Sequence, residues 1–169
     1  MTEKLLLTII CALIIWAIKG IVSHQIRSSR LKAGLVADIN MHIEGAKEQR
    51  GAVRILIEDT AQVGQKLPFP LSHNVGQYSF YISNQKDLPV YLSKTKLVKV
   101  IKFYQAIWEL DVSINGLATT LGIWERDNRE LTDRDIKHLK KRKARIDSFC
   151  DVICAKEIKN ISDLPDDYR

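Results

Sequence analysis

LLLTIICALIIWAIKGIV, residues 5–22, is the stretch that decides how this chain is organised. Residues 5–18 carry no charge, and every one of them except Thr8 is apolar. A helix rises about 1.5 Å per residue, so residues 5–22 extend about 27 Å, just short of a hydrocarbon core of about 30 Å. The stretch predicts a membrane-spanning helix with the apolar anchor residues Leu5, Leu6, Leu7, Ile9, Ile10, Leu13, Ile14, Ile15, Trp16 and Ile18.

Two other interpretations of this stretch fit less well. A signal peptide needs a basic leader and a small-residue cleavage site. Here Lys4 is offset by Glu3, and the run leaves through Lys19 and Gly20 without such a site. A soluble core helix usually has one polar face, whereas residues 5–18 are apolar all round and would need burial on every side. A membrane anchor is therefore the interpretation we adopt.

The charges that flank the stretch predict its orientation. Lys19 can extend its ammonium group toward the headgroups, and Trp16 lies one turn earlier at a depth suited to an indole. Lys19, Arg27, Arg30 and Lys32 follow in sequence with no acidic residue before Asp38. The positive-inside rule then puts residues 23–169 in the cytoplasm of a single-pass protein.

Length and composition bound the rest of the chain. The 169 residues include 46% hydrophobic and 27% charged residues, which is typical of a folded protein, and few prolines interrupt the long helical patterns. Three cysteines make an odd count, and Cys150 and Cys154 lie four residues apart on one expected helix, a poor geometry for a disulfide. We expect an all-α protein, in which a single transmembrane helix is followed by a small bundle of helical hairpins.

Changes of pattern divide the chain into segments. We expect a short N-terminal tail at 1–4, the span at 5–22, a juxtamembrane and amphipathic helix at 23–63, a linker at 64–74 with Pro68 and Pro70, a helical domain at 75–161 and an acidic tail at 162–169.

Apolar residues at helical spacing predict the packing faces. The first stripe, within one long helix or two collinear ones over residues 30–61, is Leu31, Leu35, Ile39, Ile43, Ala46, Val53 and Ile57. A short helix over 75–84 follows the linker. A longer helix, capped by Ser93 or Thr95 and ended by Gly122, has the stripe Leu97, Ile101, Tyr104, Trp108, Ile114, Leu117 and Leu121.

A last helix begins at the capping box formed by Thr132 and Asp135. Its stripe is Ile136, Leu139, Ile146, Phe149 and Ile153. Lys143 falls where that stripe needs an apolar side chain, so either its aliphatic stem covers the core or the stripe shifts to Arg142 and Ala144.

The sequence carries none of the common motifs for catalysis or cofactor binding. The sequence has no phosphate-binding glycine loop, nucleophile elbow, Cys-x-x-Cys or His-Glu-x-x-His. The nearest approaches to metal-ligand spacing are Asp38 with His42 and Asp135 with His138, which fall short of the ligand set of a helical metal site. We expect no enzyme activity, cofactor, metal or small-molecule substrate.

A basic segment within residues 137–145 is the one other feature that suggests a partner. Its cations are Lys137, Lys140, Lys141, Arg142, Lys143 and Arg145. Beside a membrane they suit anionic lipid headgroups, and in composition they also resemble a nucleic-acid patch. A solvated helix face is the simpler explanation of the same residues.

Two functions from different classes therefore stay open, and an enzyme whose site forms only in the fold is a third. The first is a membrane-tethered module that binds another protein or itself. The second is a tethered protein that binds nucleic acid or anionic lipid through the basic segment, with Lys96, Lys99 and Lys102 as further cations. We favour the first, because the sequence carries no specific nucleic-acid motif.

Overall fold

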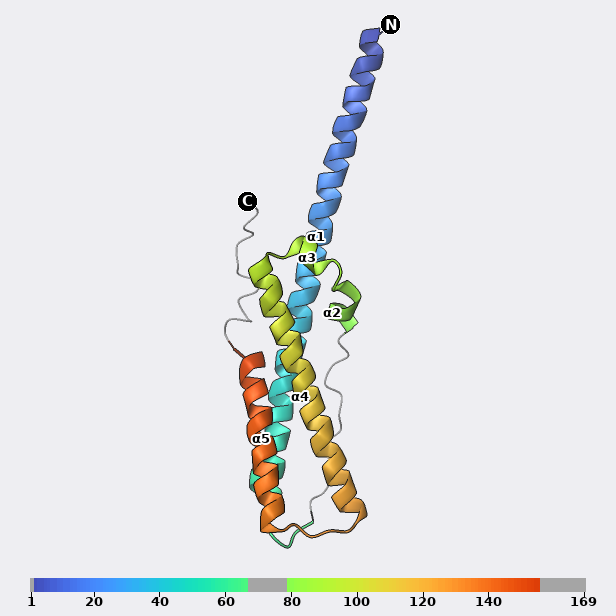
Figure 1. Ribbon diagram of the computed structural model, residues 1–169. Coiled ribbons are helices and arrows are strands. Elements are labelled where there is room, and N and C mark those ends of the chain that lie inside the picture. The colour runs from blue at the N-terminus through green and yellow to red at the C-terminus, as the bar shows by residue number, and fades with distance from the viewer. Residues whose placement is uncertain (1, 67–78, 156–169) are drawn as a thin grey trace.

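The computed structural model describes residues 2–66 and 79–155. In that part of the chain every regular element is a helix. The elements in order are α1 (Thr2–Arg54), the π-helix η1 (Ile55–Thr60), α2 (Ser79–Asn84), α3 (Leu88–Tyr91), α4 (Lys94–Arg126) and α5 (Asp133–Ile153). The all-helical class expected from the sequence is confirmed (Figure 1).

Helix α1 is unbroken over 53 residues and extends about 80 Å. Its first half projects beyond the other helices, and its second half packs against them (Figure 1). All seven residues of the first predicted stripe are buried, namely Leu31, Leu35, Ile39, Ile43, Ala46, Val53 and Ile57. In η1 the neighbouring residues Leu56 and Ile57 are both buried, so the last turns of this rod contribute a wider apolar face.

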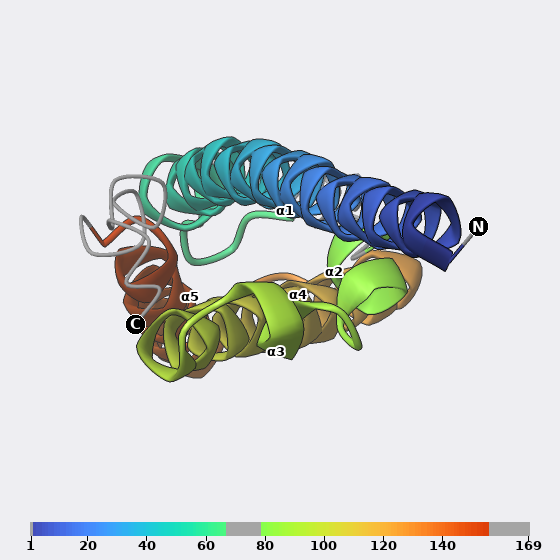
Figure 2. The same ribbon diagram turned by 90° about the horizontal axis from the view of Figure 1, so that it is seen from above.

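The packed part is a three-helix bundle of α1, α4 and α5. Helices α1 and α4 run in the same direction and α5 runs against both (Figure 1), while Figure 2 shows α5 at one side of the gap between α1 and α4. Helices α4 and α5 thus form an antiparallel hairpin, whereas α1 and α4 run parallel. The reason is that the chain returns to the middle of α1 before α4 begins, since α2 and α3 pack there.

Helices α2 and α3, which we call the collar, lie against one side of α1 where it leaves the bundle (Figure 2). The Phe80 ring lies so close to Gly34 that a Cβ atom at residue 34 would overlap it. Arg27 forms an ion pair with Asp87 at 2.6 Å, and the rings of His24 and Tyr91 lie 4.9 Å apart. The collar therefore contacts α1 at the point where its apolar end begins to project.

At the opposite end of the bundle, two connections are hydrogen-bonded to each other. Leu131 accepts a backbone hydrogen bond from Gly64 at 3.0 Å and donates one to Gln65 at 3.1 Å. Gly64 has a φ of +78°, a conformation that glycine adopts without steric cost. These bonds join the end of η1 to the turn between α4 and α5.

The helix starts agree with the sequence signals better than the helix ends. Ser93 caps α4 by accepting from the Lys96 amide, and Thr132 with Asp135 forms the predicted capping box of α5. The expected end of α4 at Gly122 is wrong, because the helix continues to Arg126. The turn is made instead by Asn128, whose φ of 53° lies in the left-handed region that asparagine tolerates.

The core of α4 and α5 differs from the predicted stripes at several positions. Ile114, Leu117, Leu121, Leu139, Ile146 and Ile153 are buried as expected. Ile101 and Trp108 face solvent instead, which corrects their assignment to the core. Five fully buried residues lie outside the predicted stripes, namely Val100, Phe103, Ile107, Leu110 and Cys150. The Lys143 side chain extends from α5 to Glu58 of η1 and is only 18% exposed. Its aliphatic part therefore takes the position where the stripe needs an apolar residue.

Two expected features, the acidic tail and most of the linker at 64–74, fall outside the described residues. The same is true of the first four residues of the short helix expected at 75–84, whose remainder is α2.

Candidate functional site

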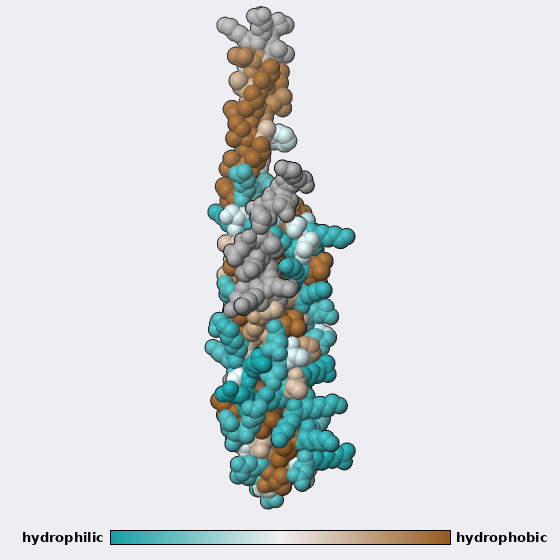
Figure 3. All heavy atoms as spheres, turned by 90° about the vertical axis from the view of Figure 1, so that its left-hand side faces the viewer, coloured by the Kyte–Doolittle hydropathy of each residue, from teal (hydrophilic) through white to brown (hydrophobic). Residues whose placement is uncertain are grey.

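The projecting end of α1 is an exposed apolar surface. It is the one described helix that is long and apolar enough to cross a membrane, and none of its apolar window is buried. Of the predicted anchor residues with described side chains, all are exposed: Leu7, Ile9, Ile10, Leu13, Ile14, Ile15, Trp16 and Ile18. Figure 3 shows this end as a hydrophobic band above a largely hydrophilic bundle.

A groove follows directly where the apolar surface ends. It has a volume of about 620 Å³ and lies between α1 and the collar. Lys19, Arg27 and Arg30 supply its cations, and Phe80 lies on its wall. The Arg27 guanidinium has a pKa raised by its hydrogen bond and charge interaction with Asp87. The change from apolar to cationic surface therefore falls within three turns of α1.

The basic segment lies at the other end of the molecule. Lys143 contacts Glu58 at 3.0 Å, and Val22 is separated from Glu58 by about 50 Å of helix at about 1.5 Å per residue. The screening length in physiological salt is only about 8 Å. If residues 5–22 lie in a bilayer, the basic segment is therefore too far from the lipid headgroups for electrostatic attraction between them, even with α1 tilted.

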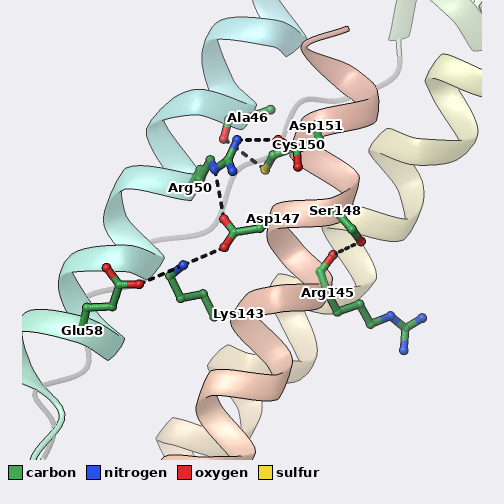
Figure 4. A network of polar contacts seen from close by, with 9 residues as sticks. All are labelled: Ala46, Arg50, Glu58, Lys143, Arg145, Asp147, Ser148, Cys150 and Asp151. Atoms are coloured by element: carbon green, nitrogen blue, oxygen red, sulfur yellow. Dashed lines mark hydrogen bonds and ion pairs between the residues drawn. The ribbon is translucent and has the colours of Figure 1, made fainter.

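The members of the basic segment have different surroundings. Lys143 has 18% of its side chain exposed and bridges Glu58 and Asp147, and both hydrogen bonds raise its pKa (Figure 4). Asp147 also accepts from Arg50 on α1 at 3.0 Å, and Arg50 reaches Asp151 at 2.8 Å. Lys143 is thus part of the α1–α5 contact, whereas Lys137, Lys140, Lys141 and Arg145 are exposed and Arg142 is half-buried.

Close packing accompanies this ion-pair network. The Cys150 thiol lies 3.6 Å from the carbonyl oxygen of Ala46, to which it donates (Figure 4). Burial raises the pKa of Cys150 to about 12, so the thiol stays protonated and unreactive at neutral pH. Ala46 is fully buried, and its small side chain allows α5 to approach α1 at this point.

A second polar cluster lies inside the bundle between α1 and α4. Tyr104 donates its hydroxyl hydrogen to Asp38, and Nε2 of His42 lies 3.7 Å from the same carboxylate oxygen. The Tyr81 ring of α2 stacks on Tyr104 with the ring centres 4.2 Å apart. Burial is the main cause that raises the pKa of Tyr104 and lowers the pKa of His42, and the negative charges of Asp38 and Asp111 partly oppose the shift of His42.

The structure places the two pairs with metal-ligand spacing, Asp38 with His42 and Asp135 with His138, in different surroundings. Asp38 and His42 belong to the buried cluster with Tyr104. Asp135 is held by Thr132 and by Arg129, whose Nη2 lies 2.8 Å from Oδ1 of Asp135, while His138 is exposed on α5. Hydrogen bonding to Thr132 is the main cause that lowers the pKa of Asp135. Among the described residues, no group of three metal-ligating side chains lies close enough to hold an ion.

The sequence did not identify the partner of Asp38. Tyr104 was assigned to the core from its spacing, and nothing in that spacing indicated that its hydroxyl would reach α1. The signal that was available is the buried position of Asp38 beside the apolar stripe, since a buried carboxylate requires a donor.

Comparisons of the chain with protein-family models, with curated proteins and with solved structures found no match.

Proposed function

We propose that this chain is a single-pass membrane protein whose helical bundle acts as a protein-protein interaction module on the cytoplasmic face. Residues 5–22 form the anchor, and residues 23–169 lie in the cytoplasm. The observation that carries the proposal is the exposed apolar surface of the projecting end of α1 over residues 7–18.

Free energy of transfer supports the anchor. Ten large apolar side chains between Leu7 and Val22 are exposed. Burying such a side chain contributes about 1.5–3 kcal/mol. The free energy of transferring this surface from water into a bilayer is therefore favourable by on the order of 20 kcal/mol. The cations that begin at Lys19 and continue through Lys32, with no acidic residue before Asp38, support the cytoplasmic orientation.

The shape of the molecule supports an interaction role rather than a catalytic one. The bundle extends away from the apolar end of α1 as a rod, and its buried polar groups Asp38 and Tyr104 contact each other. The exposed surfaces of α4 and α5 are among the surfaces available to a partner.

The anchor is tested with the full chain in isolated membranes. The protein should stay in the membrane pellet after extraction at alkaline pH. The double variant Ile10→Lys with Ile14→Lys should appear in the soluble or aggregated fraction, because each lysine near the centre of a span costs about 2.5–3.5 kcal/mol.

The matched control puts the same change on exposed apolar residues beyond the proposed span. Ile55→Lys with Val63→Lys should leave the protein in the pellet. Release of the unchanged chain into the soluble fraction contradicts the anchor. A reporter fused after Arg169 that is active only outside the cytoplasm contradicts the orientation.

A further inference from the structure

Helix α4 carries apolar side chains on two opposite faces. One face is the core of the bundle, which includes Phe103, Ile107, Leu110 and Ile114. The other face is exposed and carries Val98, Ile101, Trp108 and Val112, with Gln105 at the remaining position of the same stripe. Their spacing of three and four residues is that of a helix seam which packs against another helix. We call these five residues the outer stripe.

A basic row on α5 lies beside the outer stripe. His138, Lys141, Arg142 and Arg145 line a groove of about 370 Å³ together with Val112 and Ser113 of α4. Val112 belongs to both the groove and the outer stripe, so the apolar and basic surfaces adjoin.

Glu109 of α4 is an acidic partner of this row, and its ion pair with the row is weak. Arg145 lies 3.4 Å from Oε2 of Glu109, and the Arg145 side chain is largely exposed. An exposed ion pair of this kind contributes little to stability, so a partner carboxylate can replace Glu109.

From these two surfaces we infer that the outer stripe and the basic row together dock an acidic amphipathic helix of another protein. This inference rests on the proposed function and names the kind of partner that the module binds. Apolar residues of the partner pack on Trp108 and its neighbours, and carboxylates along one flank pair with Lys141, Arg142 and Arg145. Trp and Arg are the residue types most enriched among the energetically dominant contacts of interfaces.

The dimensions of the stripe set the length of the partner. From Val98 to Val112 the stripe extends about 21 Å, or four helical turns. A docked helix of about 15 residues, with apolar residues at every third and fourth position, covers it.

Charge favours this occupant over the alternatives. A nucleic acid would use the basic row and leave Trp108 and Ile101 in water. A second copy of the chain is less complementary, because each copy carries a net charge of +6. An acidic helix satisfies the apolar and the basic surface together.

The test uses the full chain in phosphatidylcholine nanodiscs and a pair of model peptides. Both peptides are helices of about 18 residues with leucines at every third and fourth position. One carries glutamates along a flank and the other carries lysines at the same positions. The glutamate peptide should bind at least about tenfold more tightly than the lysine peptide.

Charge reversal provides the specific readout. Lys141→Glu with Arg142→Glu should weaken binding of the glutamate peptide at least about tenfold and strengthen binding of the lysine peptide. Lys137→Glu with Lys140→Glu makes the same change in net charge outside the groove and should alter the affinity by less than about threefold. Trp108→Ala should weaken both peptides, and circular dichroism checks that each variant keeps its helix content.

Three results overturn the inference. The first is equal binding of the two peptides. The second is tighter binding of an RNA or DNA duplex that is unaffected by Trp108→Ala, and the third is dimerisation of the chain itself that Trp108→Ala abolishes. Failure of the anchor is seen separately, because the chain would then not insert into the nanodisc at all.

Discussion

Tyr104 on α4 donates its phenolic hydroxyl to the Asp38 carboxylate on α1, inside the bundle and between residues 66 positions apart. Both side chains are buried, and Tyr81 stacks on the tyrosine ring from α2. This contact brings three helices together at a single polar point.

Removing the hydroxyl should destabilise the bundle. Tyr104→Phe leaves the buried Asp38 carboxylate without this donor, and hydrogen bonds to charged groups contribute about 1.5–3 kcal/mol. Urea unfolding of the full chain in detergent micelles should show a loss of this size. The control Trp108→Phe, one turn further along α4 and 56% exposed, should change stability by no more than about 0.5 kcal/mol. Equal effects of the two changes would contradict the buried role of Tyr104.

Stability should fall as the pH is lowered from 7 to 5. Burial lowers the pKa of His42 in the folded chain, although Asp38 and Asp111 act in the opposite direction. Below the unfolded pKa of about 6.5, the unfolded state therefore binds more protons than the folded state, and stability decreases by up to about 1.4 kcal/mol per pH unit. The loss ends once the pH passes below the folded pKa.

Variants of two histidines identify the group responsible for this pH dependence. His42→Asn should reduce the difference in unfolding free energy between pH 7 and pH 5. His138→Asn, which changes an exposed histidine of α5, should leave that difference unchanged. A wild-type chain that is equally stable at both pH values would show that His42 does not titrate in this way.

Two glycines of α1 should respond in opposite directions to alanine. At Gly34 the new methyl group would overlap the Phe80 ring, and overpacking of this kind costs about 1–3 kcal/mol. At Gly45 nothing lies within 4 Å of the new Cβ atom, so the gain in helix propensity should stabilise the chain by about 0.5–1 kcal/mol. The unfolding midpoints of the two variants should lie on either side of the wild-type value, and Gly34→Ala with Phe80→Ala should relieve the overlap.

The ion pairs between α1 and α5 should not be equivalent. Asp147 is mostly buried and accepts from both Arg50 and Lys143, whereas 66% of the Asp151 side chain is exposed. Asp147→Asn should cost about 1–2 kcal/mol in urea, because two partly buried cations lose their shared partner. Asp151→Asn should cost less than about 0.5 kcal/mol. A larger effect at Asp151 would contradict the arrangement in Figure 4.

Local signals in the sequence predicted much of the fold. Ser93 and the Thr132–Asp135 capping box mark helix starts because they satisfy free amides within their own turn. The stripe from Leu31 to Ile57 was predicted because only one face of that helix is apolar. Helix α4 has two apolar faces, and spacing alone does not tell which one packs, so Ile101 and Trp108 were wrongly assigned to the core.

Long-range arrangement was the part that local signals missed. The parallel course of α1 and α4 depends on contacts between segments far apart in the sequence, which helical spacing and capping signals do not report. For the same reason the distance between the basic segment and the apolar end of α1 was not foreseen. Lys143 was correctly noted as a conflict, and its partner Glu58 comes from a helix 85 positions earlier in the sequence.

The unbroken course of α1 makes the molecule a lever. The same helix that forms the apolar end also forms one wall of the bundle, and the collar contact of Arg27 with Asp87 braces it where the two parts meet. A change of roughly 10° in the tilt of the apolar end, well within the range of tilts that membrane helices adopt, swings the far end by about 9 Å. If the apolar end spans a bilayer as proposed, the tilt of that end and the position of the tip of the rod are therefore mechanically coupled.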